Sequence, residues 1–387
     1  MMFKIIRVTT IPLSLKAFCS GLPGELREEL GAEVVAVSSP EKGLVEYGSA
    51  EGVRTVGVPM ERHISPLRDL RSLWGMIRVF RKERPDMVHS MTPKAGLISM
   101  MAAWVCRVPV RIHTFTGLVF PTSTGLKQKI LMFTDGLTCA CATHVIPEGE
   151  GVKADLTNYG ITRKPLRVLG YGNVKGIDLE RFDPTREEIR EEALRIRKEL
   201  GLTSDDFVFV FIGRLVGDKG INELVEAFGR LQKVHPEVRL ILVGPEEAEL
   251  DPLKGETMAE IGSNDAISAV GKQSDVRPWY AVADAFVFPS YREGFPNCVM
   301  EAGAMGLPSI VTDINGSREI ILDGENGVVI PSKDSVALYD AMRDFVEDDD
   351  RRGRMAAKAR ELVASRFEQS YVRGCLKDFY RNVLFKH

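Results

Sequence analysis

The sequence predicts an α/β protein made of two doubly wound domains, each with a parallel sheet. Its 387 residues are too many for one ordinary domain and suit two of about 180–200 residues. Short apolar segments alternate with helical segments along the chain, as strand–helix–strand units do. Segments such as FVFVFIG and AFVFPS are apolar nearly throughout, which is typical of strands buried on both faces of a sheet.

The composition excludes several classes of protein. With 44% hydrophobic and 27% charged residues it is that of an ordinary globular chain, and no apolar run reaches the roughly 18 residues of a membrane span. The N-terminus reads as a first strand instead of a signal peptide, because it lacks a small-residue cleavage site. The six cysteines show no pair spacing of a zinc site or a disulfide framework. We therefore expect a cytoplasmic, reduced protein.

In the first half we expect a loop and then a helix over residues 23–30 between the first two strands. The predicted strands are FKIIRVTT, AEVVAVSS, VRTVGVPM, DMVHS and PVRIHTF. The last of these carries His113 towards its carboxyl end, where the ligand crevice of a parallel sheet opens. Such a histidine is either a structural core residue or one that faces a ligand, and the pattern leaves both interpretations open.

A helix is predicted before Pro85, which stops it. Its apolar face is formed by Leu67, Leu70, Leu73, Trp74, Ile77 and Phe80, at roughly helical spacing. Its polar side carries Arg68, Arg71, Arg78, Arg81, Lys82 and Arg84. This side is either a solvated face of a helix packed on the sheet or a surface that rests on anionic lipid headgroups.

Charge is distributed unevenly between the two halves. The net charge of the whole chain is −3. Residues 1–184 contain 24 Lys and Arg against 18 Asp and Glu, a balance of +6, and the remaining residues contain 27 against 36, a balance of −9. This asymmetry indicates different partners for the two halves.

The second half opens with a strand that ends at Gly213, followed by Arg214 and Lys219 before a helix begins near Gly220. Gly213 lets the backbone come close to a ligand. Arg214 offers a planar fork of donors and Lys219 a mobile point charge, which together suit a diphosphate. Surface Arg and Lys pairs are usually only solvated, but these two lie between a strand and a helix, where the crevice of the sheet is expected.

The stretch from 285 to 328 is the most informative part of the chain. A buried strand, AFVFPS, leads through a loop with Glu293 into a helix over about 296–305, which Gly306 and Pro308 end. Glu301 lies just over one turn into this helix. Both carboxylates are therefore placed where a nucleotide that carries a sugar could meet them. A Glu near a helix start can also simply complement the helix dipole.

The string EGFPNCVMEAGAMGLP, with seven residues between Glu293 and Glu301, resembles the signature of retaining family-4 glycosyltransferases, which have the GT-B fold. The resemblance extends over essentially the whole chain. It implies two Rossmann-like domains that face each other across a cleft. Residues 1–184 would form the acceptor-binding domain and residues 185–369 the nucleotide-sugar-binding domain, with a terminal helix over 370–387 that packs back on the first.

The same resemblance assigns roles to particular residues. It places Glu301 on the ribose of the donor, Glu293 on the hydroxyls of its hexose, and Arg214 and Lys219 on its diphosphate. The further donor contacts that it implies are main-chain contacts of Gly271 and Lys272 with the nucleobase edge, amides around Gly294, Phe295 and Asn297 towards sugar and phosphate, and His113 near the reacting carbon. Gly21, in the first glycine-bearing loop, would approach the donor phosphates, or else it is a turn glycine.

The segment HSMTPKAGLISMMAAWVCRVPVRIHTFTGLVFPT resembles the capsular-polysaccharide branch of this family. That implies transfer of a hexose or N-acetylhexosamine-type sugar from a nucleoside diphosphate sugar, UDP being expected, to a polyprenyl-linked saccharide. We expect no cofactor, metal or nucleic acid, and peripheral attachment to an anionic membrane surface at the inner face of the cell membrane. The alternatives are a GT-B sugar-nucleotide epimerase or hydrolase, and a nucleotide-binding protein without activity.

Overall fold

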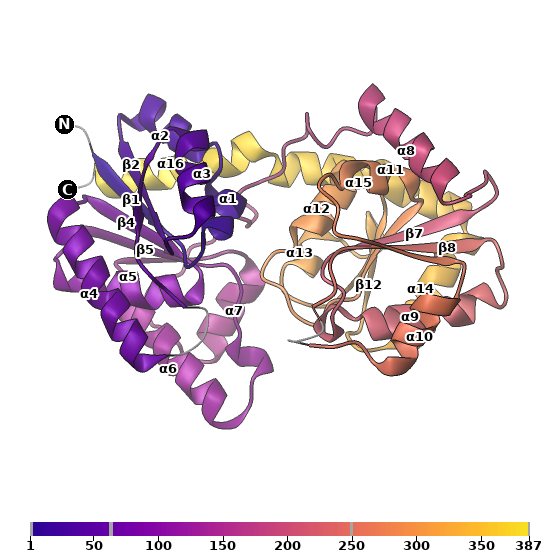
Figure 1. Ribbon diagram of the computed structural model, residues 1–387, viewed down its shortest axis with the longest axis horizontal. Coiled ribbons are helices and arrows are strands. Elements are labelled where there is room, and N and C mark those ends of the chain that lie inside the picture. The colour runs from indigo at the N-terminus through magenta and orange to yellow at the C-terminus, as the bar shows by residue number, and fades with distance from the viewer. Residues whose placement is uncertain (1–2, 62–64, 248–250, 386–387) are drawn as a thin grey trace. The chain divides into compact units, whose positions relative to one another are not determined.

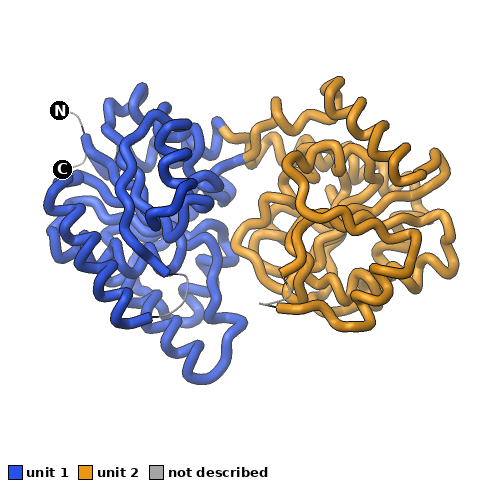
Figure 2. Tube along the Cα trace, in the orientation of Figure 1, with its two compact units in different colours: residues 1–176, 370–387 blue, residues 177–369 orange. Residues whose placement is uncertain are grey.

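The computed structural model describes residues 3–61, 65–247 and 251–385, and Figure 1 shows the arrangement of their helices and strands. The chain forms two compact units, which Figure 2 shows in different colours: residues 1–176 with 370–387, and residues 177–369. The first boundary follows Gly176 and not residue 184, because Ile177 already bonds within the second unit. Its N–H donates to Phe367 (2.8 Å), and its carbonyl accepts from Gln369 (3.0 Å).

Unit 1 is built on a parallel sheet of strand order β3-β2-β1-β4-β5-β6. The strands are β1 (Lys4–Val8), β2 (Glu33–Ser38), β3 (Arg54–Gly57), β4 (Met87–Met91), β5 (Val110–Phe115) and β6 (His144–Pro147). The helices are α1 (Pro12–Cys19), α2 (Leu22–Leu30), α3 (Lys42–Glu51), α4 (Pro66–Glu83), α5 (Pro93–Val105), the 3₁₀ turn η1 (Phe120–Thr122), α6 (Gly125–Cys141) and α7 (Glu150–Asn158). Helices cover both faces of this sheet (Figure 1).

Unit 2 repeats the plan with the strand order β12-β11-β10-β7-β8-β9, again all parallel. Its strands are β7 (Phe207–Ile212), β8 (Val238–Val243), β9 (Ile267–Gly271), β10 (Ala285–Phe288), β11 (Ser309–Thr312) and β12 (Gly327–Ile330). Its helices are α8 (Glu187–Glu199), the 3₁₀ turn η2 (Gly217–Lys219), α9 (Ile221–Gln232), α10 (Gly255–Ser263), α11 (Arg277–Val282), α12 (Asn297–Ala304), α13 (Ser317–Ile320), α14 (Ser335–Glu347) and α15 (Asp349–Phe367). The central strands β7 and β10 are buried at every position, as their uninterrupted apolar sequence predicts.

The last helix, α16 (Gln369–Leu384), packs on unit 1. Its apolar side chains join the core cluster around β1 and α2, and Tyr380 is fully buried there. Lys377 also bonds to Glu25 (2.8 Å) and Glu29 (2.5 Å) of α2. Apolar burial and paired charges therefore both hold the end of the chain on the first sheet.

Two predictions for unit 1 are wrong. Residues Pro12–Cys19 form α1, where the sequence predicted a loop. In α4, Leu67, Leu70 and Trp74 are 85%, 54% and 55% exposed, although they were predicted to lie on the buried face. The helix buries Ile77 and Phe80 of the predicted face, together with Met76 and Glu83. Arg54 bonds Glu83 with both of its Nη atoms, and these hydrogen bonds lower the pKa of Glu83 to about 2.

Candidate functional site

The candidate site lies at the carboxyl ends of β7 and β10, the two central strands of the second sheet. Chain order reverses between them, since β7, β8 and β9 run towards one edge and β10, β11 and β12 towards the other. In open parallel sheets the ligand crevice opens at such a reversal. The two loops that follow the strands are joined by hydrogen bonds from Tyr291 N–H to the carbonyl of Asp218 (2.8 Å) and from Arg292 Nη2 to its carboxylate (3.1 Å).

Lys219 and Glu293, one from each loop, meet in this crevice. The ammonium of Lys219 contacts Oε1 of Glu293, and Ser290 Oγ donates to the same oxygen (2.9 Å). The two side chains are only 12% and 18% exposed. The ammonium also lies 5.6 Å from the ring centroid of Phe288, within the range of a cation–π contact. The two predicted site residues are therefore held together and mostly out of water.

Arg214 is the more accessible cation of the site. Its Nη1 donates to Oε2 of Glu247 (2.8 Å), and its side chain is 42% exposed. Burial opposes the charge of Arg214, but the hydrogen bond and the field of Glu247 outweigh it and raise the pKa of the guanidinium. The guanidinium therefore stays charged at every working pH, and its exposed part remains free to meet an anionic ligand.

A buried tyrosine forms a hydrogen bond with the carboxylate of Glu301. The hydroxyl oxygen of Tyr280, in α11, lies 3.1 Å from Oε2 of Glu301 and 3.1 Å from the carbonyl oxygen of Cys298, and these two acceptors share its one proton. Burial, together with the field of Glu301, raises the pKa of Tyr280 well above its ordinary value, so the hydroxyl remains a donor. The carboxylate is thereby fixed in direction on the first turns of α12.

Close approach of the backbone shapes the crevice. A Cβ on Gly220, whose φ is +71°, would overlap the carbonyl oxygen of Pro289, so the loops after β7 and β10 can approach only with glycine there. Gly213 follows β7 and Gly271 ends β9. Gly244, which follows β8, donates its N–H to the carbonyl of Gly271 (2.9 Å). Lys272 follows at the surface. At the carboxyl ends of these three neighbouring strands the backbone therefore carries no side chains that would keep a ligand away.

The loop from Gly294 to Asn297 leads into the N-terminus of α12. The side chain of Phe295 is buried against Phe367, with ring centroids 5.4 Å apart, so only its main chain can face a ligand. Gly294 and Phe295 also lie against the backbone of Gly316. The first N–H groups of α12 have no partner within the helix, and such groups suit an anion.

Two predicted residues lie in unit 1. His113 is 1% exposed, with Nδ1 2.9 Å from Ser90 Oγ, and a Cβ on Gly96 of α5 would overlap its ring. Burial lowers the pKa of His113 to about 3, so the ring is neutral. The geometry supports the structural role for this histidine, and contact with the donor stays a prediction.

Gly21 follows α1 and is separated by that helix from the carboxyl end of β1. It has φ +78°, its N–H donates to Glu51 Oε2 (2.8 Å), and Arg373 lies against it. The geometry supports a turn glycine and gives no support to a phosphate contact.

The sequence did not predict several residues that contact the site. Asp218, Tyr280 and Glu247 form hydrogen bonds with site residues or loops that are distant from them in sequence. At the reversal of the first sheet, between β1 and β4, Thr92 has φ 71°, which is unusual for a β-branched residue. Its hydroxyl lies 2.8 Å from that of Thr10. Because strained backbone clusters at functional sites, this pair marks the crevice of unit 1.

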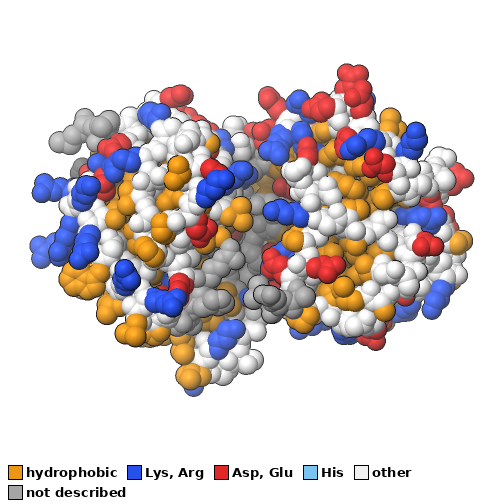
Figure 3. Space-filling model, viewed as in Figure 1, with side chains coloured by type: hydrophobic (Ala, Val, Ile, Leu, Met, Phe, Trp, Pro, Cys, Tyr) orange, Lys and Arg blue, Asp and Glu red, His pale blue; other side chains and the backbone are white. Residues whose placement is uncertain are grey.

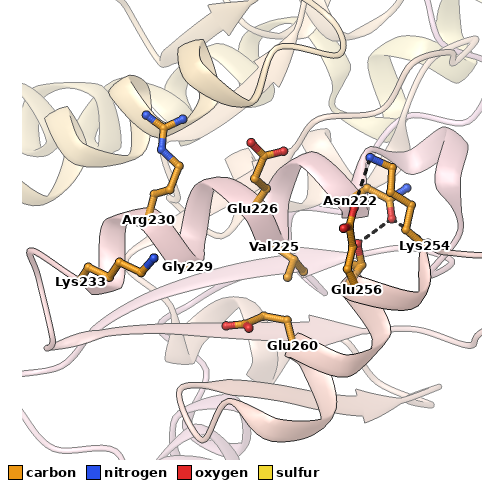
Figure 4. A pocket seen from close by; sticks show the side chains of 10 residues that line it. Asn222, Val225, Glu226, Gly229, Arg230, Lys233, Lys254, Glu256 and Glu260 are labelled. Atoms are coloured by element: carbon orange, nitrogen blue, oxygen red, sulfur yellow. Dashed lines mark hydrogen bonds and ion pairs between the residues drawn. The ribbon is translucent and has the colours of Figure 1, made fainter.

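The site is distinct from a pocket of about 400 Å³ between α9 and α10 (Figure 4). That pocket is lined by both acidic and basic side chains, and its Asn222 only ties Lys254 and Thr257 to α9. Among residues 3–61, 65–247 and 251–385, no cluster of three or more His, Cys, Asp or Glu is arranged to hold a metal ion. None of the described helices is both long and apolar enough to cross a membrane.

Comparison with known proteins gives matches in both units. The family model for glycosyl transferases group 1 matches residues 192–362, and that for the glycosyl transferase 4-like domain matches residues 22–172. The chain is 30% identical over 382 residues to the capsular polysaccharide biosynthesis glycosyltransferase CapM of Staphylococcus aureus, with 98% of this chain and 97% of that protein covered.

A second relative is the UDP-Gal:alpha-D-GlcNAc-diphosphoundecaprenol alpha-1,3-galactosyltransferase of Escherichia coli, which is 28% identical over 302 residues and covers 77% of this chain and 76% of that protein. Among solved structures, Anabaena HepE in complex with UDP superposes with a TM-score of 0.80 at 17% identity, covering 99% of this chain and 100% of that chain. This likeness confirms the predicted GT-B fold.

Proposed function

Because this chain belongs to the group 1 glycosyltransferases, a retaining family, we propose that it moves a hexose or N-acetylhexosamine-type sugar from a UDP-sugar to a lipid-linked saccharide during surface polysaccharide biosynthesis. The choice of UDP and of a polyprenyl diphosphate acceptor is supported by the names of relatives, one of which acts on a diphosphoundecaprenol substrate.

The observation that carries the proposal is the meeting of Lys219 and Glu293 at the reversal of the second sheet. A carboxylate beside an ammonium gives a site that can contact sugar hydroxyls and a diphosphate at once. Glu301, oriented by Tyr280, is suited to a pair of ribose hydroxyls. Lys219, Glu293 and Glu301 thus provide for the diphosphate, the hexose and the ribose of a nucleotide sugar.

The chemistry that this arrangement can supply is stabilisation of the leaving diphosphate. As the bond between the sugar and the phosphate breaks, negative charge grows on the phosphate oxygens, and fixed cations lower the barrier most when they are already in place. Lys219 is held in place by Glu293, and Arg214 by Glu247. The incoming phosphates would compete with Glu247 for the more exposed guanidinium, while the N-terminus of α12 adds N–H donors.

For the acceptor side we propose that unit 1 attaches peripherally to an anionic membrane. The +6 balance of residues 1–184 and the exposed side chains of Leu67, Leu70 and Trp74 beside the arginines of α4 support this. A lipid-linked saccharide would then be presented at the surface where the enzyme binds.

The test is a thermal-shift screen of nucleotide sugars followed by product analysis with a polyprenyl diphosphate saccharide. A donor that binds only the folded protein raises its melting temperature by mass action. We expect stabilisation by UDP and by a UDP-sugar, and transfer to the lipid-linked saccharide with retained anomeric configuration. Release of UDP without a glycosylated product, or an epimerised sugar nucleotide, would favour a hydrolase or an epimerase instead.

A further inference from the structure

A surface pocket of unit 1 brings three arginines together at the amino ends of β4 and β5. Arg81 belongs to the last turn of α4, Arg84 follows that helix, and Arg107 follows α5. All three line one pocket of about 550 Å³, and all three side chains are exposed. Its floor is formed by Phe80, Pro85, Cys106, Val108 and Pro109.

The charge of this pocket has little compensation. None of the three arginines forms an ion pair with a carboxylate of the described part of the chain. Asp86, the acid in the lining, already accepts the N–H of Lys4 (2.8 Å). Glu83, the nearest acid on α4, is buried against Arg54 and Lys4. The pocket therefore carries a net positive charge that a neutral or cationic ligand would not complement.

Two of the arginines stand where glycine is the usual residue. Arg84 and Arg107 have φ values of 47° and 55°, in the left-handed region that favours glycine at helix ends. Arg84 is the C-cap of α4 and donates its N–H to the carbonyl of Phe80 (2.9 Å). Arg107 lies one residue beyond the C-cap of α5 and donates its N–H to the carbonyl of Trp104 (3.1 Å). Complementing the dipole of α4 would not require Arg84, because Arg81 and Lys82 already lie in the last turn of that helix.

Apolar side chains project beside the same pocket. Trp104 and Val105 end α5 and are 60% and 45% exposed, next to Cys106 and Arg107 of the lining. In Figure 3, Lys and Arg side chains gather at the edge of unit 1 where α4 lies, with hydrophobic side chains beside them. Exposed Trp beside Arg is typical of the membrane–water interface, where the ring lies at the headgroup level and the charge meets phosphate.

We propose that Arg81, Arg84 and Arg107 form a binding site for the phosphate of an anionic phospholipid headgroup, with Trp104 and Val105 inserted beside it. The guanidinium forks suit phosphate oxygens in a bidentate manner, and all three arginine side chains are accessible from solvent. This deepens the membrane attachment proposed above. It adds a defined headgroup site at the end of α4, distinct from general attraction to the basic helix.

The test uses the full chain and vesicles of phosphatidylcholine with or without phosphatidylglycerol. The variant Arg84→Gly with Arg107→Gly removes two charges, and glycine fits both left-handed positions, so the melting temperature should change little. Each arginine near an anionic surface contributes about fivefold in affinity, so we expect a loss of about 30-fold for phosphatidylglycerol vesicles. The control is Lys16→Gln with Arg163→Gln, an equal loss of charge at two exposed positions of unit 1 away from the pocket.

A large loss in the first variant and a loss of less than about threefold in the control would support the site. Equal losses in both variants would mean diffuse attraction only and would overturn it, as would wild-type binding by the Arg84→Gly and Arg107→Gly variant. Stabilisation by inorganic phosphate that this variant abolishes, without any vesicle binding, would assign the pocket to a soluble anion. Because vesicle binding needs no sugar transfer, failure of the proposed enzymatic function would leave this result unaffected.

Discussion

The ammonium of Lys219, which follows β7, contacts the carboxylate of Glu293, which follows β10. The two central strands of the second sheet thereby bring a cation and an anion from 74 residues apart into one contact. The carboxylate fixes the cation in place before any ligand arrives. Such pre-organisation lets a charge act on a transition state without further reorganisation.

We expect Lys219→Ala and Arg214→Ala each to lower the rate of sugar transfer by about 10²-fold or more, as loss of one fixed donor to a developing anion does. The measurement is kcat with saturating donor. Lys254→Ala, in the pocket between α9 and α10, is the matched control and should keep wild-type turnover. Near-normal rates in both site variants would contradict the assignment of the diphosphate to these cations.

The two glutamates should separate nucleotide binding from sugar transfer. Glu301→Gln is expected to weaken binding of free UDP, because its proposed target is the ribose. Glu293→Gln should leave UDP affinity near the wild-type value and lower the rate of transfer. Calorimetric titration with UDP gives the comparison, and an equal loss of affinity in both variants would show that the roles are misassigned.

Removal of the hydroxyl that orients Glu301 should also weaken UDP binding. Tyr280→Phe deletes a hydrogen bond to a charged group, which contributes about 1.5 kcal/mol or about tenfold in affinity. The control is Tyr47→Phe, whose hydroxyl bonds to the carbonyl of Cys19 in unit 1. If Tyr280→Phe binds UDP as the wild type does, Glu301 does not depend on this tyrosine for its orientation.

The two loops of the site should tolerate no side chain at Gly220. In Gly220→Ala a methyl group would overlap the carbonyl of Pro289, so we expect a loss of more than about 3 kcal/mol in the free energy of unfolding, together with loss of transfer. Gly201 has a similar φ of 64° but no atom within 4 Å of an added Cβ. Gly201→Ala should therefore cost only about 1–2 kcal/mol, the preference against the left-handed region. The free energies of unfolding of both variants are measured with denaturant. Equal values for Gly220→Ala and Gly201→Ala would show that the two loops can move apart at no cost in stability.

The sequence predicts the two central strands of the second unit, because they are uninterrupted apolar runs. β7 and β10 lie where such runs predict them. As predicted, Arg214 and Lys219 lie between β7 and α9, Glu293 lies in the loop after β10, and Glu301 lies just over one turn into α12. Their partners do not follow from the sequence. Tyr280 looks like any core aromatic residue until the fold places its hydroxyl under Glu301.

The errors in unit 1 have a similar cause. Hydrophobic periodicity assigned Leu67 and Trp74 to the core, but they are exposed. The buried face of α4 includes Glu83, because Arg54 and Lys4 neutralise that carboxylate. The periodicity of one helix cannot predict an ion pair with residues of two other strands, because those residues are distant in sequence. The segment of α1 is only eight residues long and lies between a strand and the Gly21 turn, and so short a segment holds too few turns for a helical period to be recognised.

The acid stability of the protein should depend on two buried histidines of unit 1. Burial lowers the pKa of His113 to about 3, and burial and the field of Arg7 lower that of His89 well below 6.5. Each ring is neutral in the folded protein but binds a proton in the unfolded chain once the pH falls below about 6.5. The unfolded state then holds more protons, so stability falls as the pH decreases from about 6.5, by at most about 1.4 kcal/mol per pH unit for each histidine.

His113→Gln removes one of these titrating groups, and we expect its melting temperature to fall less steeply between about pH 7 and pH 5 than that of the wild type. The variant should be less stable than the wild type at neutral pH, because the packing against α5 and the contact with Ser90 are altered. The slope with pH is therefore the informative quantity, not the absolute value. His235→Gln, at a position in unit 2 bonded to Glu237 and Glu347, controls for the loss of any histidine. A His113→Gln slope identical to that of the wild type would mean that His113 is protonated in the folded protein, and its ring would then have to reach solvent or a carboxylate.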